Sequence, residues 1–167
     1  MLNFVANTRR FAGAMAASLL IAGLAHAGIE IEAGNTRVSA SSLTFSVSQQ
    51  PAYDPETYMP VEPKRMQLFT GALYVSRGFD ASSVTILKHV VDGTTLPTVR
   101  VTMTQDGKPG RQVWDLTNAT FNNYSTYVGE GDAIVENFEI GYKTARLSVY
   151  TDAGNTPTAS VNWTSAE

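Results

Sequence analysis

The sequence contains no cysteine and only two histidines among its 167 residues. The lack of cysteine excludes a disulfide framework, a zinc–thiolate site, an iron–sulfur cluster and a thiol nucleophile. One of the two histidines, His26, belongs to the N-terminal segment described next, so the remaining chain has only His89. A single histidine cannot supply a histidine pair for a metal site. The chain must therefore be held together by its core, by tight hairpins or by association with other subunits.

The first 27 residues have the three parts of a cleavable signal peptide. Arg9-Arg10 ends a basic region, an apolar stretch covers residues 11–24, and Ala25-His26-Ala27 is a small-x-small cleavage site. The apolar stretch has about 14 residues, whereas roughly 20 are needed to cross a bilayer. The sequence predicts a signal peptide over residues 1–27, exported by the Sec or the twin-arginine route. The mature domain would then cover residues 28–167 and lie in the periplasm or outside the cell.

Charge is also sparse, at 16% of the residues. The whole chain has 12 Lys+Arg and 15 Asp+Glu, and residues 1–27 hold two arginines and no acid. The mature chain therefore has 10 basic and 15 acidic residues, a net charge of −5. This acidic balance argues against a nucleic-acid partner, whose phosphates require a basic surface. The mature chain also has no polybasic run for anionic lipid and no second apolar segment that could span a membrane.

Most of the mature chain alternates between apolar and polar residues, the period-two pattern of β-strands. Segment 50–65 carries four prolines and is predicted to be an extended loop, because proline lacks the N–H that a strand needs. Many short strands with one inserted helix predict a mainly β, antiparallel barrel or sandwich in a single domain. The predicted strands are 28–32, 38–48, 66–76, 96–104, 111–117, 119–128, 132–142, 146–151 and 159–164.

The one predicted helix covers Asp80–Val91. Asp80, Ser82 and Ser83 are all suitable N-cap residues, and Gly93 stands where a left-handed C-cap belongs. Apolar residues recur on one side of this helix, and such a stripe is expected to pack against the sheet. The stripe consists of Val84, Leu87, Val90 and Val91.

No group of side chains indicates catalysis. His89 could activate Ser82 or Ser83 only in a nucleophile elbow such as G-x-S-x-G, which is missing, so we interpret it as a surface or interface histidine. The acidic residues are scattered, and Glu136 and Glu139 should face opposite sides of one strand. The sequence leaves open that two carboxylates elsewhere in the chain face each other across a cleft, as in a glycosidase. We expect a protein that is not an enzyme, without cofactor, and we assign no catalytic, cofactor-binding or metal-binding residue.

Four aromatic residues on predicted strands allow a second interpretation. Stacked on one surface, they could form a sugar-binding platform, although strand aromatics more often fill a core or an interface. These residues are Trp114, Tyr124, Tyr127 and Trp163. The alternative function is therefore a monomeric periplasmic or surface binding module, with glycans as the ligand class.

Four stretches, in this order, resemble the haemolysin-coregulated protein (Hcp) family, the tube proteins of type VI secretion systems. They are VSASSLTFSVSQ (Val38–Gln49), the strand–helix–strand stretch Tyr74–Met103, VWDLTNATFNNYST (Val113–Thr126) and GDAIVENFEIGYKTARLSVYT (Gly131–Thr151). The last stretch matches the pattern E-x-F-x-[LI]-x-Y-[KR] through Glu136, Phe138, Ile140, Tyr142 and Lys143.

The resemblance implies a small antiparallel β-barrel with one helix on its flank, which self-assembles as a hexameric ring. In that family the rings stack into a tube, with sheath, spike and small effector proteins as partners. Members normally act without a signal peptide, so the leader predicted here indicates an exported relative. The resemblance favours a structural protein that works by self-association rather than by catalysis.

Overall fold

The computed structural model describes residues 27–51, 56–57, 59 and 66–164. The predicted signal peptide lies outside these residues except for Ala27, and so does most of the predicted loop 50–65. Within the described residues the chain forms eleven strands, one α-helix and a 3-10 turn at Glu130–Asp132. The strands and helix are β1 (Ala27–Ala33), β2 (Thr36–Ala40), β3 (Ser42–Thr44), β4 (Val47–Pro51), β5 (Met66–Thr70), β6 (Leu73–Gly78), α1 (Ser83–Asp92), β7 (Thr95–Gln105), β8 (Arg111–Val128), β9 (Ile134–Gly141), β10 (Thr144–Tyr150) and β11 (Ala159–Thr164).

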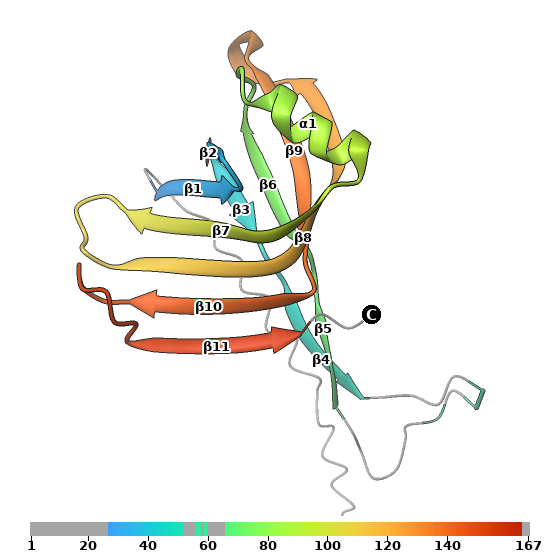
Figure 1. The fold of residues 1–167 in the computed structure, drawn as a ribbon, viewed down its shortest axis with the longest axis vertical. Helices are drawn as coiled ribbons and strands as arrows, with labels where there is room; N and C mark the ends of the chain where they lie inside the picture. Colours follow the sequence, from blue (N-terminus) through green and yellow to red (C-terminus); the bar gives the residue numbers. More distant parts are fainter. Residues whose placement is uncertain (1–26, 52–55, 58, 60–65, 165–167) are drawn as a thin grey trace, which may run out of the picture.

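Nine of these strands form one antiparallel sheet (Figure 1). Seven of them pair in the order β2-β1-β7-β8-β9-β6-β3, and β10 pairs with both β8 and β11. The ends of the path, β2 and β3, are separated in the chain by Ser41 alone, but no hydrogen-bonded pair joins them in the described residues. The predicted mainly β fold with a single helix is confirmed, as an antiparallel sheet whose ladder is open.

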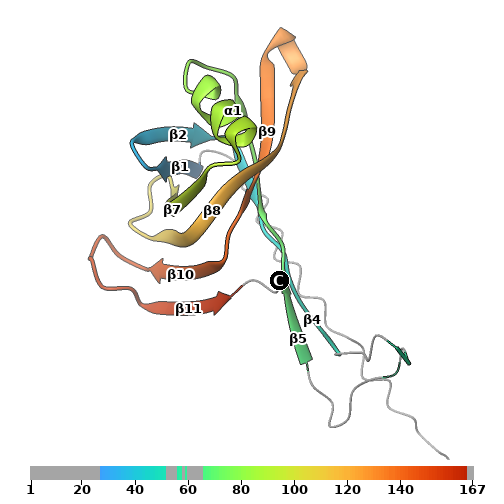
Figure 2. The same cartoon turned by 45° about the vertical axis from the view of Figure 1, so that its right-hand side comes forward.

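The remaining strands, β4 and β5, pair with each other as a separate two-stranded ribbon. Both views show this ribbon running away from the body of the sheet (Figures 1 and 2). The ribbon also explains why two predicted strands are divided. Residues 38–48 become β2, β3 and the start of β4, and residues 66–76 become β5 and most of β6. The chain leaves the sheet where the Gly71 N–H donates to the Ser46 carbonyl at 3.0 Å.

The sequence predicts two strands at 111–117 and 119–128, but in the structure these segments form one strand, β8, of 18 residues. Its first part pairs with β7 and β10, and its last part pairs with β9. Asn118 and Asn123 have positive φ angles of 46° and 51°. Asparagine tolerates this left-handed conformation better than most residues, so the strand bends at these positions instead of ending.

The core lies on one face of the bent sheet and follows the period-two pattern. Alternate residues of the central strands are withdrawn from solvent, and each large side chain buried there contributes roughly 1.5–3 kcal/mol. The large apolar side chains of the strands that are at most 1% exposed are Ile31, Leu73, Val99, Val101, Trp114, Leu116, Phe138 and Ile140.

α1 covers part of the sheet near β8, and its position confirms the predicted helix but not its predicted inner face (Figure 1). Ser83 and Ile86 are buried, at 0% and 2% exposure, and Val90 is partly buried against the core. The expected stripe is wrong at its other three positions, because Val84 is 66%, Leu87 41% and Val91 76% exposed. The C-cap is confirmed, since Gly93 has φ 60° and ψ 33°.

Candidate interaction surfaces

A buried ion pair joins β6 to β9 beneath the start of α1. Arg77 and Glu136 are direct partners in the β6–β9 ladder and are 2% and 0% exposed. Arg77 Nε lies 3.1 Å from Glu136 Oε1, while its N–H donates to the Gly78 carbonyl at 3.1 Å. Oε1 therefore has Arg77 as a counter-charge without an aligned hydrogen bond. The low dielectric around this pair makes it costly to remove either partner alone.

The same arginine also holds the entry to α1. Arg77 Nη1 donates to Ser82 Oγ at 2.9 Å, and Nη2 lies 2.5 Å from Asp80 Oδ2. The Ser83 hydroxyl accepts from the Asp80 N–H at 2.9 Å. The hydrogen bond from the Ser82 hydroxyl and the charge of Arg77 hold the pKa of Asp80 below its usual value. With these contacts at its entry, α1 places Ser83 and Ile86 toward the sheet and leaves Val84, Leu87 and Val91 exposed.

A bulge in β8 brings a third side chain to Glu136. The β8–β9 register shifts between Asn122 and Ser125, where Asn123 has its positive φ. Tyr124 then donates its hydroxyl hydrogen to Glu136 Oε2 at 2.6 Å. Burial raises the pKa of Tyr124 to about 12, with a further contribution from the hydrogen bond to the Glu136 carboxylate. We call the buried pair Arg77 and Glu136, together with its less buried contacts Tyr124, Asp80 and Ser82, the buried charge cluster.

The candidate catalytic residues are placed in structural contacts. Ser82 hydrogen-bonds within the buried charge cluster and Ser83 is buried, while His89 stacks on the ring of Phe121 at 5.8 Å between centroids. Neither serine is bonded to the histidine. Within the described residues, no three His, Cys, Asp or Glu side chains gather in a way that could hold a metal ion. Glu136 is buried and Glu139 lies on the other face of β9, as predicted from their odd spacing.

The four aromatic candidates do not share one surface. Trp114 is 1% exposed and forms a core cluster with Phe45 and Trp163, with ring centroids 4.6 and 5.7 Å from its own. Tyr124 belongs to the buried charge cluster, and Tyr127 is 52% exposed. Core packing, the commoner role of strand aromatics, therefore describes Trp114 and Trp163.

The face of the sheet opposite the core carries a row of alternating charge. Arg100 Nε donates to Asp115 Oδ1 at 2.7 Å, and this contact raises the pKa of Arg100. Such cross-strand pairs stabilise a sheet by a few tenths of a kcal/mol to about 1 kcal/mol each. By direct register from β2 to β11, the row reads Arg37, Glu32, Arg100, Asp115, Arg146 and Asn162.

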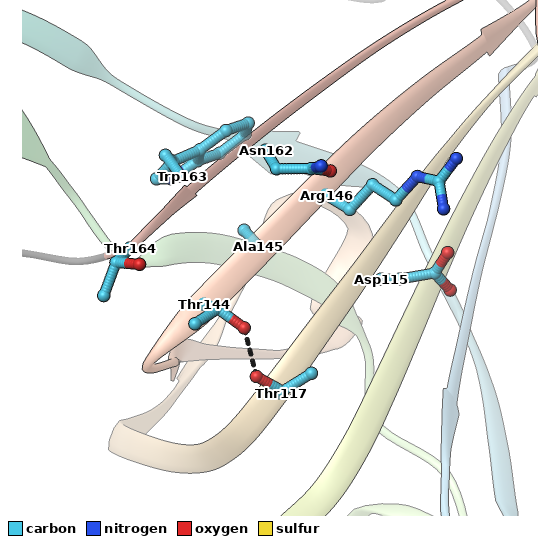
Figure 3. A pocket seen from close by; sticks show the side chains of 8 residues that line it. All are labelled: Asp115, Thr117, Thr144, Ala145, Arg146, Asn162, Trp163 and Thr164. Atoms are coloured by element: carbon cyan, nitrogen blue, oxygen red, sulfur yellow. Dashed lines mark hydrogen bonds between the residues drawn. The ribbon is translucent and has the colours of Figure 1, made fainter.

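A shallow depression of about 480 Å³ lies at the β11 end of this row. Figure 3 shows Arg146 between Asn162 and Asp115, with the hydroxyls of Thr117 and Thr144 hydrogen-bonded to each other nearby. Asp115 is paired with Arg100, and Arg146 has no ion pair within the described part of the chain. The lining residues are Asp115, Thr117, Thr144, Ala145, Arg146, Asn162, Trp163 and Thr164.

Arg77 and Arg146 are not among the residues predicted from the sequence. For Arg77 a signal was present, because the alternation of Leu73, Val75 and Arg77 places a charge at a core-facing position of β6. A charge in such a position requires a buried partner. Nothing in the sequence around Arg146 distinguishes it from other strand arginines. Its cross-strand neighbour Asp115 pairs with Arg100, and both of these residues lie on other strands.

Comparisons with known proteins find similarity to this chain in structure and not in sequence. No protein-family model matches the sequence, and no curated protein matches it. None of the helices in the described part of the chain is long and apolar enough to cross a membrane.

Solved structures, in contrast, match over most of the chain. The secreted protein Hcp3 from Pseudomonas aeruginosa is 12% identical, covers 84% of this chain and 98% of its own, and gives a TM-score of 0.58. Hcp2 from Salmonella typhimurium is 11% identical, with 82% and 95% covered and a TM-score of 0.56. A type six secretion system protein is 12% identical, with 83% and 96% covered and a TM-score of 0.63. The chain therefore has the fold of the Hcp proteins of type VI secretion systems.

Proposed function

We propose that this protein is an exported structural protein that self-assembles into rings, with six subunits as the expected number, and acts without catalysis. The observation that supports this most is the Hcp fold itself, which several solved Hcp structures share over more than four-fifths of the chain. Residues 1–27 would be the leader that exports it, and residues 28–167 the assembling domain.

The exposed side of the helix is consistent with a subunit contact. Three apolar residues on α1 face solvent in the single chain, and Phe79 and Ile134 beside the helix entry are 47% and 50% exposed. The Phe79 N–H donates to the Ile134 carbonyl at 2.9 Å, so these two apolar residues lie together. Exposed apolar groups that gather in one region are typical of interaction surfaces.

The proposal is tested by the mass of residues 28–167 in solution. Sedimentation velocity over a wide range of concentrations should show a species of about six subunits in equilibrium with the monomer. Val91→Asp should shift that equilibrium toward monomer, because an unpaired charge is costly in a dry interface. The matched control is Thr98→Asp, at an exposed position on the polar face of β7. A strict monomer at every concentration would reject self-assembly.

A further inference from the structure

Among the described residues, β11 is an edge strand with no neighbour on its outer side. It pairs with β10 over Ala159–Val149 to Thr164–Thr144 and with no other strand of the described residues. The strand is exposed along its length except at Trp163, which is partly buried. Edge strands are usually protected from pairing by lysine, proline, a bulge or brevity. The six residues of β11, ASVNWT, contain no charge and no proline, so this edge remains open to another strand.

The two faces of this edge differ in chemistry. On the polar face Ser160, Asn162 and Thr164 alternate along the strand, with Arg146 directly behind Asn162 on β10. On the other face lie Val161, which is 53% exposed, and Trp163, whose Nε1 donates to the Tyr142 hydroxyl at 3.2 Å. A strand added here would continue the polar face on one side and the apolar face on the other.

The row of alternating charge indicates which side chain the polar side of such a strand should carry opposite Asn162. Positive and negative residues alternate along the row as far as Arg146, and the next position is the neutral Asn162. Asp115 pairs with Arg100, which leaves the exposed Arg146 guanidinium without an ion pair in the described residues. A carboxylate opposite Asn162 would lie two strand spacings from β10, roughly 10 Å between backbones. The Arg146 side chain and the Asn162 amide both lie on the polar face that such a strand would extend.

We propose that β11 is a strand-addition site for an extended segment of a partner protein, in which an acidic residue faces Arg146 and Asn162 and apolar residues flank it on the other face. Main-chain hydrogen bonds to the open edge would supply affinity, as in other strand-addition complexes, and Arg146 would supply selectivity. This site is separate from the α1 side of the molecule, and it does not depend on the proposed self-assembly.

The test uses two fluorescently labelled synthetic peptides, SGTVEVTGS and SGTVQVTGS, titrated with the protein chain 28–167 in fluorescence anisotropy. The glutamate peptide should bind about fivefold more tightly than the glutamine peptide at low salt, the size expected of an exposed charge-assisted contact. Arg146→Gln should remove this difference and leave the weaker binding. Arg37→Gln, at the far end of the same row, is the matched control and should preserve the preference.

Two further variants examine the edge and the row separately. Val161→Lys places a charge on the open edge and should abolish binding of both peptides, while thermal unfolding checks that the domain still folds. Arg100→Gln should also reduce the preference for glutamate, because it frees Asp115 to neutralise Arg146. Equal binding of the two peptides, or binding by neither up to millimolar concentration, would overturn the proposal.

Sedimentation of the same variants separates this proposal from self-assembly. If the wild-type chain forms rings and Val161→Lys dissociates them, β11 is the contact between subunits, and the proposed partner segment is wrong. If the wild-type chain is monomeric and still selects the glutamate peptide through Arg146, ring formation fails and strand addition stands.

Discussion

Arg77 of β6 and Glu136 of β9 face each other across the ladder and form an ion pair with both side chains almost completely withdrawn from solvent. The pair joins two strands and, through Arg77, also holds the entry to the only helix of the described part. The entry to α1 is therefore linked through Arg77 to a contact between strands that are far apart in the chain.

Removing one member of this pair should destabilise the domain strongly. Glu136→Gln removes the buried counter-charge of Arg77 and leaves it only the exposed Asp80 carboxylate. Breaking a buried ion pair on one side typically costs about 3–5 kcal/mol. The double variant Arg77→Met, Glu136→Leu should be clearly more stable than Glu136→Gln, because two apolar side chains leave no buried charge. Urea denaturation followed by circular dichroism measures both. If the double variant were the less stable of the two, the ion pair would stabilise the fold outright, contrary to this account.

Tyr124 should make the fold sensitive to alkaline pH. Its pKa is raised from 10 to about 12, so between these values the unfolded chain loses the phenolic proton while the folded chain retains it. The folded state then binds more protons, and stability must fall as pH rises through this range. Tyr124→Phe should cost about 1–3 kcal/mol at pH 8, because Glu136 Oε2 loses its donor. Its further loss between pH 10 and 12 should be smaller than that of wild type, as measured by urea unfolding at each pH.

Asp80 should make the stability of the fold depend on pH in the acidic range. Its lowered pKa means that the carboxylate stabilises the fold above the unfolded-state pKa and that this stability disappears as pH falls through the folded-state pKa. Because the side chain is 59% exposed, we expect Asp80→Asn to cost less than about 1 kcal/mol at pH 6. The difference from wild type should vanish once the pH is low enough to protonate Asp80 in the folded state. A difference that persisted there would show that charge is not its cause.

Two neighbouring helix positions should respond in opposite ways. Ile86 is 2% exposed, so Ile86→Ala should lower the free energy of unfolding by about 2–5 kcal/mol. Leu87 is 41% exposed, and Leu87→Asp should change the stability of the monomer by less than about 1 kcal/mol. Thermal unfolding at low protein concentration compares the two. Unfolding of the Leu87→Asp monomer would restore the helix face that the sequence alone predicts.

Processing of the leader is tested by intact-mass measurement of the protein recovered from the periplasm or medium of an expressing bacterium. We expect a chain that begins at Gly28. Ala27, the last residue before the expected cut, opens β1 opposite Gln105, so cleavage there would leave the rest of the β1–β7 ladder in place. Replacing Ala25 and Ala27 with arginine should block cleavage and leave the full-length mass.

Local pattern predicted much of this fold. The strand segments 96–104 and 159–164 and the helix near 80–91 all correspond to observed elements, because alternation and capping act over a few residues. The division of β8 was wrong because asparagine reads as a turn residue, whereas Asn118 and Asn123 bend a strand that continues. The resemblance to the Hcp family is confirmed at the level of the fold.

The sequence by itself therefore determined the kind of fold, since the apolar alternation and the helix end at Gly93 are local properties of the chain. Only the tertiary structure decided which of two adjacent helix faces is buried. The stripe through Leu87 and the face through Ile86 both suit a helix, and the packed structure buries the second, with Arg77 in contact with Asp80 and Ser82 at the helix entry. Strand order likewise leaves Arg146 without an ion pair in the described residues, because its neighbour Asp115 on β8 pairs with Arg100 on β7.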